Sequence, residues 1–224
     1  MVVAVVPLKN LSQAKSRLAP LLSDRERRNL VVAMCGDVLA ALKKANGLSE
    51  IFVVADGLGD GFDGVSLILE VENRGYDEAV ATALADPRVA GAEAILVLPG
   101  DLPMVRPGDI EAFIGNVNSK ETMIGKRVGP VVRIAPARDG DGTNALLLAP
   151  PGLMPTQFGP GSFARHRATA EALVSTVEIV APPGLAFDID TPQDLLDFCA
   201  RDCETGTHEF LRRSGVAGRL MRAG

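Results

Sequence analysis

Short apolar runs alternate with segments of helical periodicity along the first half of the chain. Val2–Val6 is continuous, largely β-branched and followed by Pro7, and comparable runs recur, so we expect buried strands at 2–6, 51–55, 65–69 and 94–98. A helix is predicted after Ser23, which forms a capping-box pattern with Glu26 and precedes apolar residues at helical spacing: Leu30, Met34, Val38 and Leu42. A second helix is expected over 76–85. This alternation predicts an α/β fold, with a mainly parallel sheet and helices on both faces.

The second half of the chain is less regular. Its pattern predicts strands at 122–125, 131–135 and 144–149, then a Gly/Pro-rich stretch and a helix over 163–173. Beyond residue 200 the chain is rich in arginine, and we expect a short helix near 209–213 followed by a frayed, solvated end. The predicted organisation is one domain over residues 1–200 and an Arg-rich C-terminal tail over 201–224.

Composition narrows the class of protein. The 224 residues carry a formal net charge of −5 and include eight Phe, one Tyr and no Trp, which disfavours a nucleic-acid binder that relies on basic surfaces or stacked bases. No apolar run approaches the roughly 20 residues of a membrane span, so we expect no membrane partner. Three cysteines form neither a disulfide framework nor a zinc pattern, which favours the cytoplasm. A homodimer is the default expectation for assembly.

The run Phe187-Asp188-Ile189-Asp190-Thr191-Pro192 is the most informative motif. Side chains two apart in an extended segment point the same way, so Asp188 and Asp190 would face one site. Two close carboxylates favour a neutralising cation, and oxygen ligands of this kind suit Mg²⁺. The plainer interpretation is helix capping, with Thr191 as N-cap and Pro192 in the first turn, and the motif alone favours capping.

Ligands of a parallel sheet bind beyond the carboxyl ends of its strands, and this rule picks out residues 7–17, 56–75 and 99–103. Asp101 lies in a Gly/Pro turn after the run 94–98, as an Asx-turn residue or a metal ligand. The loop after the first strand carries Lys9, Lys15 and Arg17, which could bind a triphosphate or simply be solvated. A Gly-rich turn leads to Ser162, which is an N-cap or part of an anion site, and His166 is expected to contact an anion or lie on the surface.

Five ordered motifs resemble the guanylyltransferases of coenzyme F420 biosynthesis, the CofC/FbiD family. They are Pro7-Leu8-Lys9 with Ala14-Lys15-Ser16-Arg17-Leu18, Gly100-Asp101-Leu102-Pro103, Gly142-Thr143-Asn144-Ala145-Leu146, Phe158-Gly159-Pro160-Gly161-Ser162-Phe163, and the paired-aspartate motif. The resemblance implies a Rossmann-like nucleotidyltransferase fold. It also implies transfer of GMP from GTP to a three-carbon phosphorylated acid, with release of pyrophosphate. The acceptors known in the family are 2-phospho-L-lactate, phosphoenolpyruvate and 3-phospho-D-glycerate, and we favour phosphoenolpyruvate.

The same resemblance implies roles for individual residues. Asp101, Asp188 and Asp190 resemble the ligands of Mg²⁺, and Thr143, Gly159 and Ser162 resemble the residues that hold the acceptor. Lys9 and Lys15 would act in catalysis by neutralising the GTP phosphates. The nucleotide-binding set implied by the motifs is Pro7, Lys9, Lys15, Arg17, Gly75 and Gly100. Family members often have Gly-Leu-Asn where this chain has Gly75-Tyr76-Asp77.

Two rival functions remain open at this point. One is another nucleotidyltransferase, such as a molybdenum-cofactor guanylyltransferase, although those usually open with a glycine-rich loop where this chain has Pro7-Leu8-Lys9-Asn10. The other is a non-catalytic nucleotide-binding regulatory protein, which would not need all three acidic residues.

Overall fold

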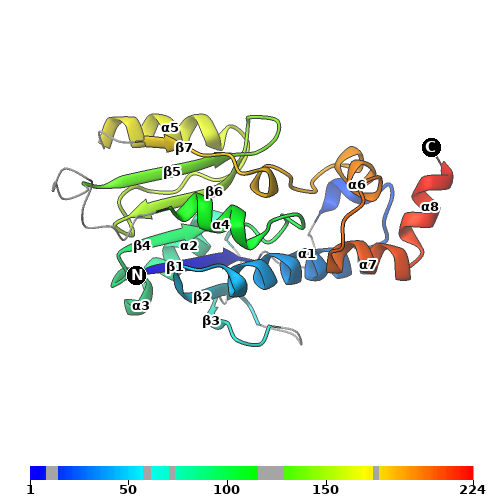
Figure 1. The fold of residues 1–224 in the computed structure, drawn as a ribbon, viewed down its shortest axis with the longest axis horizontal. Helices are drawn as coiled ribbons and strands as arrows, with labels where there is room; N and C mark the ends of the chain where they lie inside the picture. The colour runs from blue at the N-terminus through cyan, green and yellow to red at the C-terminus, as the bar shows by residue number, and fades with distance from the viewer. Residues whose placement is uncertain (9–14, 58–61, 71–73, 116–128, 174–176, 224) are drawn as a thin grey trace.

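A computed structural model describes residues 1–8, 15–57, 62–70, 74–115, 129–173 and 177–223 (Figure 1). Lys9 and the strand predicted at 122–125 lie outside these residues. The described strands form one seven-stranded sheet in the order β3-β2-β1-β4-β6-β5-β7. They are β1 (Val2–Pro7), β2 (Leu48–Ala55), β3 (Ser66–Leu69), β4 (Ala94–Val97), β5 (Val131–Pro136), β6 (Thr143–Ala149) and β7 (Val177–Ile179).

The predicted mainly parallel sheet is confirmed. β1 pairs in parallel with β2 and β4, and β2 pairs in parallel with β3. β6 is the reversed strand, antiparallel to both of its neighbours, β4 and β5, whereas β7 is again parallel to β5. Because β6 runs backwards, its first residues lie at the edge where β4 ends.

Helices cover both faces of this sheet, as the sequence predicts. They are α1 (Asp24–Lys44), α2 (Tyr76–Leu84), α3 (Pro87–Ala90), α4 (Pro107–Ile114), α5 (Ser162–Leu173), α6 (Pro192–Cys199), α7 (Gly206–Arg213) and α8 (Val216–Ala223), with 3₁₀ turns η1 (Ser16–Leu18) and η2 (Pro183–Leu185). Alternate residues of β1 serve the two faces. Val2, Ala4 and Val6 pack with α1 and α4, and Val3 and Val5 pack with α2 and α5.

Helix α1 begins as its sequence predicts. The Ser23 hydroxyl accepts a hydrogen bond from Glu26 N–H, and the Glu26 carboxylate accepts one from Ser23 N–H at 2.8 Å. The predicted apolar stripe of Leu30, Met34, Val38 and Leu42 is buried against the sheet. The turn η1, which has Lys15 as its N-cap, precedes this helix.

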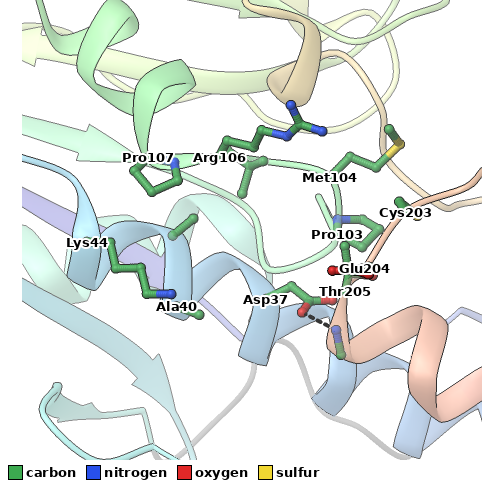
Figure 2. A pocket seen from close by; sticks show the side chains of 13 residues that line it. Asp37, Ala40, Lys44, Pro103, Met104, Arg106, Pro107, Cys203, Glu204 and Thr205 are labelled. Carbon is green, nitrogen blue, oxygen red and sulfur yellow. Dashed lines mark hydrogen bonds between the residues drawn. The ribbon is translucent and has the colours of Figure 1, made fainter.

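The C-terminal residues form two packed helices, so the prediction of a frayed, solvated end is wrong. Leu211, Val216 and Leu220 are buried in the same core as α1. At the start of α7, the Asp37 carboxylate on α1 accepts hydrogen bonds from Gly206 N–H at 2.7 Å (Figure 2) and from Thr207 N–H at 2.9 Å. The arginines of this segment lie on the outer side of an amphipathic pair of helices, which is why a charge count alone suggested a solvated tail.

No helix in the described part of the chain is both long and apolar enough to cross a membrane.

Candidate active site

Asp101, Thr143 and the paired aspartates of the predicted site gather at one edge of the sheet. Asp101 follows β4, and Thr143 begins β6, which enters the sheet beside the end of β4, since Val97 lies opposite Leu146. The Asp188–Asp190 segment is joined to the same edge by a hydrogen bond of 3.3 Å from Ile189 N–H to the Asp101 carbonyl. Residues from three distant parts of the sequence therefore meet where parallel sheets bind ligands.

Lys15 joins two of the three predicted carboxylates. Its Nζ donates a hydrogen bond to Asp101 Oδ2 at 2.6 Å and another to Asp190 Oδ1. Only 9% of the Lys15 side chain is exposed. Burial alone would lower the pKa of Lys15, but the two carboxylates outweigh it and raise that pKa. The ammonium group is therefore permanently charged and bound to the acidic cluster.

The backbone at Lys15 is also unusual, since it has φ 54° and ψ 43°. This left-handed conformation is uncommon for a residue other than glycine and recurs at functional sites. Here it starts the turn η1, and the lysine side chain reaches the carboxylates from that turn.

Asp188 lies deeper than its partner and is held by Asn144, whose side-chain amide donates to Asp188 Oδ1 at 3.2 Å. Burial raises the pKa of Asp188 to about 6, and the charges of Asp101 and Asp190 add to the effect. Phe187 and Ile189 are buried on the other side of this segment, so the predicted alternation is present. The result is three close carboxylates, of which two are paired with Lys15 and one is poorly solvated.

A β-bulge at the start of β6 aims two neighbouring side chains at different partners. The register passes from Ala135 opposite Ala145 to Pro136 opposite Thr143, which leaves Asn144 as an extra residue on β6. As a result Asn144 turns toward Asp188, while Thr143 turns toward α5, where its Oγ1 lies 3.0 Å from His166 Nδ1.

His166 is buried, so the prediction of a surface residue or anion contact is wrong. It is 0% exposed, and its Nε2 accepts a hydrogen bond from Gln157 N–H at 2.8 Å. Burial lowers the pKa of His166 to about 4. The nearby charge of Asp77 raises this pKa, and that of Arg165 lowers it. The sequence suggested an exposed residue because Arg165 and Arg167 flank it, and both of these arginines are exposed, with the Arg165 guanidinium donating to the Gln157 and Pro160 carbonyls.

The Gly-rich turn before α5 lies beside the start of α2. Asp77 Oδ1 accepts a hydrogen bond from Phe158 N–H at 2.9 Å, and the Tyr76 and Phe158 rings lie 5.3 Å apart. Burial raises the pKa of Tyr76, and the charge of Asp101 raises it further. Gly75 precedes α2 with φ 111°, and Gly159 has φ 110°. Residues other than glycine rarely adopt these backbone angles. The segment Gly75-Tyr76-Asp77 therefore lies against the Gly-rich turn of the candidate site.

The remaining predicted residues are distributed as follows. Pro7 and Gly100 are buried at the strand ends, and a Cβ at Gly100 would lie 3.4 Å from Cys35 Sγ. Ser162 is buried as the first residue of α5, and Arg17 is exposed on η1. Sequence reasoning did not select Asn144 or Cys35, whereas it noted Tyr76 in the segment Gly75-Tyr76-Asp77. Asn144 stood inside a motif that was read for its threonine alone.

The hollow beside α7 is a separate feature. Its volume is about 280 Å³, and it lies between α1, residues 103–107 and residues 203–206 (Figure 2). None of the described residues of the predicted site lines it, and the acidic residues of that site lie at the carboxyl edge of the sheet.

Solved structures share this fold. A protein of Desulfovibrio desulfuricans G20, provisionally described as a nucleotide-diphospho-sugar transferase, superposes with a TM-score of 0.71 at 13% identity, over 98% of this chain and 97% of that chain. A nucleotidyl transferase from Methanothermobacter superposes with a TM-score of 0.56 at 18% identity, over 95% and 99% of the two chains. The chain thus has the α/β fold of the nucleotidyltransferase class.

The family follows from the sequence. Residues 2–223 match the family described as "Guanylyl transferase CofC like", and the chain belongs to it. Phosphoenolpyruvate guanylyltransferase of Conexibacter woesei is 39% identical over 86% of this chain and 84% of its own length. The enzyme of the same name from Rubrobacter xylanophilus is 37% identical over 87% and 91%. The resemblance inferred from the five motifs is confirmed, and the family match extends through α7 and α8.

Proposed function

We propose that this chain transfers GMP from GTP to phosphoenolpyruvate, or to a closely related three-carbon phosphorylated acid, and releases pyrophosphate for coenzyme F420 biosynthesis. Family membership and the names of its relatives support the reaction and the acceptor. The observation that carries the proposal is the cluster at the sheet edge, where Lys15 joins Asp101 and Asp190 beside Asp188. The same cluster argues against a regulator that only binds nucleotide. Close carboxylates cost stability, and a protein that only binds nucleotide does not need all three.

We propose Mg²⁺ as the cofactor on the chemistry of the three carboxylates. They are hard oxygen donors, and Mg²⁺ in such enzymes takes one or two carboxylates plus substrate phosphates. Within the described residues no group of three or more His, Cys, Asp or Glu side chains is arranged to hold a metal ion, and Lys15 supplies the compensating charge instead. Asp101, Asp188 and Asp190 would hold the ion, which when bound would stabilise negative charge on the phosphates.

The proposed reaction requires no proton transfer by a protein side chain. A phosphate oxygen of the acceptor attacks the α-phosphorus of GTP, a new P–O bond forms, and the bond to pyrophosphate breaks. The acceptor phosphate is already ionised at neutral pH, so no general base is required. This agrees with a neutral, buried His166 whose two ring nitrogens are occupied by Thr143 and Gln157. The residues act by positioning and by charge, as in other phosphoryl transfers.

Substrates would lie on two sides of the carboxylates. We propose that Lys15, with Lys9 and Arg17, neutralises the GTP phosphates, near Pro7, Gly75 and Gly100. Thr143, Gly159 and Ser162 would hold the carboxylate and phosphate of the acceptor. Of these residues, Thr143 and Ser162 are buried. The three cysteines of the chain are free thiols, which fits action in the reducing cytoplasm.

Incubation of the protein with GTP, Mg²⁺ and each acid separately tests this function. We expect pyrophosphate release together with a product whose mass equals that of the acid plus GMP, fastest with phosphoenolpyruvate, and no product in EDTA. GTP turnover that does not depend on any of the three acids would refute guanylyl transfer to such an acceptor.

A further inference from the structure

His166 has two ring nitrogens and a defined partner for each. The Gln157 backbone N–H lies 2.8 Å from Nε2, and the Thr143 hydroxyl oxygen lies 3.0 Å from Nδ1. We propose that His166 is a positioning residue for the acceptor. In this proposal it holds the Thr143 hydroxyl so that the hydroxyl proton is directed to the acceptor. The inference rests on the proposed function, which places the acceptor at Thr143.

The hydrogen bonds assign the tautomer. A backbone N–H can only donate, so Nε2 must be the unprotonated nitrogen that accepts from Gln157. Burial lowers the pKa of His166 to about 4, so the ring is neutral at pH 7 and its one proton is on Nδ1. That proton is donated to Thr143 Oγ1. The Thr143 hydroxyl oxygen then accepts from His166, and the hydroxyl proton is available for donation to the substrate.

The ring is fixed in this orientation by its surroundings. The Phe158 ring packs edge-on against it with centroids 4.9 Å apart, and Phe158 itself is tied to α2 through Asp77. The Gln157 side chain is held by Thr169 Oγ1 at 2.9 Å, one turn along α5. Gly159 follows this pair directly, so the residues that hold His166 also set the start of the acceptor turn. The charged groups that face the ring are Asp77 from α2 and Arg165 from its own helix.

The alternative is a core histidine with no influence on the acceptor. Two substitutions separate the roles of the two nitrogens. The side-chain amide in His166→Asn lies near the position of Nδ1 and can still donate to Thr143. The longer amide in His166→Gln reaches the position of Nε2 and can accept from Gln157 N–H, but it leaves Thr143 without a donor. A structural role alone predicts that the two variants behave alike.

We expect the KM for the acceptor to rise about tenfold in His166→Gln, as for loss of one oriented hydrogen bond, and to stay within about twofold of wild type in His166→Asn. The KM for GTP should change little in either variant. His208→Gln is the matched control, because His208 lies on α7 and packs on Phe198 of α6, and it should leave both values unchanged. In a Thr143→Val background, His166→Gln should have no further effect on the acceptor KM.

The tautomer has its own readout, which needs no activity. Nitrogen-15 chemical shifts of His166 in the wild-type protein at pH 7 should show a protonated Nδ1 and an unprotonated Nε2. A protonated Nε2, or equal increases in acceptor KM in His166→Asn and His166→Gln with an active wild type, would overturn the inference alone. An inactive wild type with every acid would instead remove the proposed function, and the acceptor role of His166 with it.

Discussion

Replacing Asp188 with asparagine should stabilise the metal-free fold while it abolishes turnover. The substitution keeps the shape of the side chain and an oxygen that can accept from the Asn144 amide, now 3.2 Å from Asp188 Oδ1. It removes the one carboxylate that is poorly solvated and that lies near two others. Acidic residues held in this way commonly cost stability in return for function.

The magnitude follows from the raised pKa. Burial and the neighbouring carboxylates raise the pKa of Asp188 from 3.8 to about 6. A carboxyl whose folded pKa is raised binds its proton more tightly in the folded state, so its favourable contribution is complete below pH 3.8 and is lost as the pH rises through 6. At about 1.4 kcal/mol per pKa unit, ionised Asp188 destabilises the fold by about 2–3 kcal/mol at pH 7.5 and by less than about 1 kcal/mol near pH 4.

Urea unfolding in EDTA at several pH values measures this difference. Asp188→Asn should be more stable than wild type by about 2–3 kcal/mol at pH 7.5, and the two curves should converge as the pH falls toward 4. Asp139→Asn, at an exposed carboxylate on a surface turn, is the matched control and should show no such convergence. A variant that is no more stable than wild type at pH 7.5 would refute the electrostatic reading of the cluster.

Three other substitutions test other parts of the structure. Lys15→Met leaves Asp101 and Asp190 without their cation. We therefore expect metal-free stability at pH 7.5 to fall by about 2–3 kcal/mol and kcat/KM for GTP to fall at least about a hundredfold. Unchanged kinetics would count against a catalytic role for this lysine. Gly159→Ala strains a backbone with φ 110° where a Cβ meets no atom within 4 Å, so the acceptor KM should rise about tenfold. Gly152→Ala (φ 71°), outside the site, should leave that KM unaltered. Asp37→Ala removes both hydrogen bonds to the start of α7, so the free energy of unfolding in urea should fall by about 1–2 kcal/mol. A midpoint equal to that of wild type would mean that these two hydrogen bonds contribute nothing to stability.

Much of the fold could be predicted from local pattern. The strand Val2–Pro7 is apolar on both faces because helices cover both, and the Ser23 capping box marks the start of α1 to the residue. The reversed direction of β6 left no trace in its sequence, since Thr143–Ala149 is buried throughout and a buried strand reads alike in either direction. The helix predicted near 209–213 is present as α7, but α8 and the packing of both helices were missed because short amphipathic segments rich in arginine resemble solvated chain until a partner surface is known.

The site was predictable in its residue types and less so in its contacts. The acidic residues and Lys15 could be chosen from motifs, but their pairing depends on a loop, a strand end and a segment near the C-terminus that meet only in the folded chain. His166 illustrates the limit. Its neighbours in sequence are exposed arginines, and its partners Thr143 and Gln157 lie 23 and 9 residues away. The bulge that turns Thr143 toward it is a property of strand pairing, which one strand's sequence does not carry.

Product formation from GTP and phosphoenolpyruvate by wild type and Asp188→Asn, compared in Mg²⁺, tests guanylyl transfer at this acidic cluster most directly. Mass spectrometry should detect the guanylylated acid with wild type, and pyrophosphate release should fall at least about a thousandfold in the variant, whose fold stays intact by urea unfolding. Near-normal product formation by Asp188→Asn would contradict the assignment of these carboxylates as the catalytic centre.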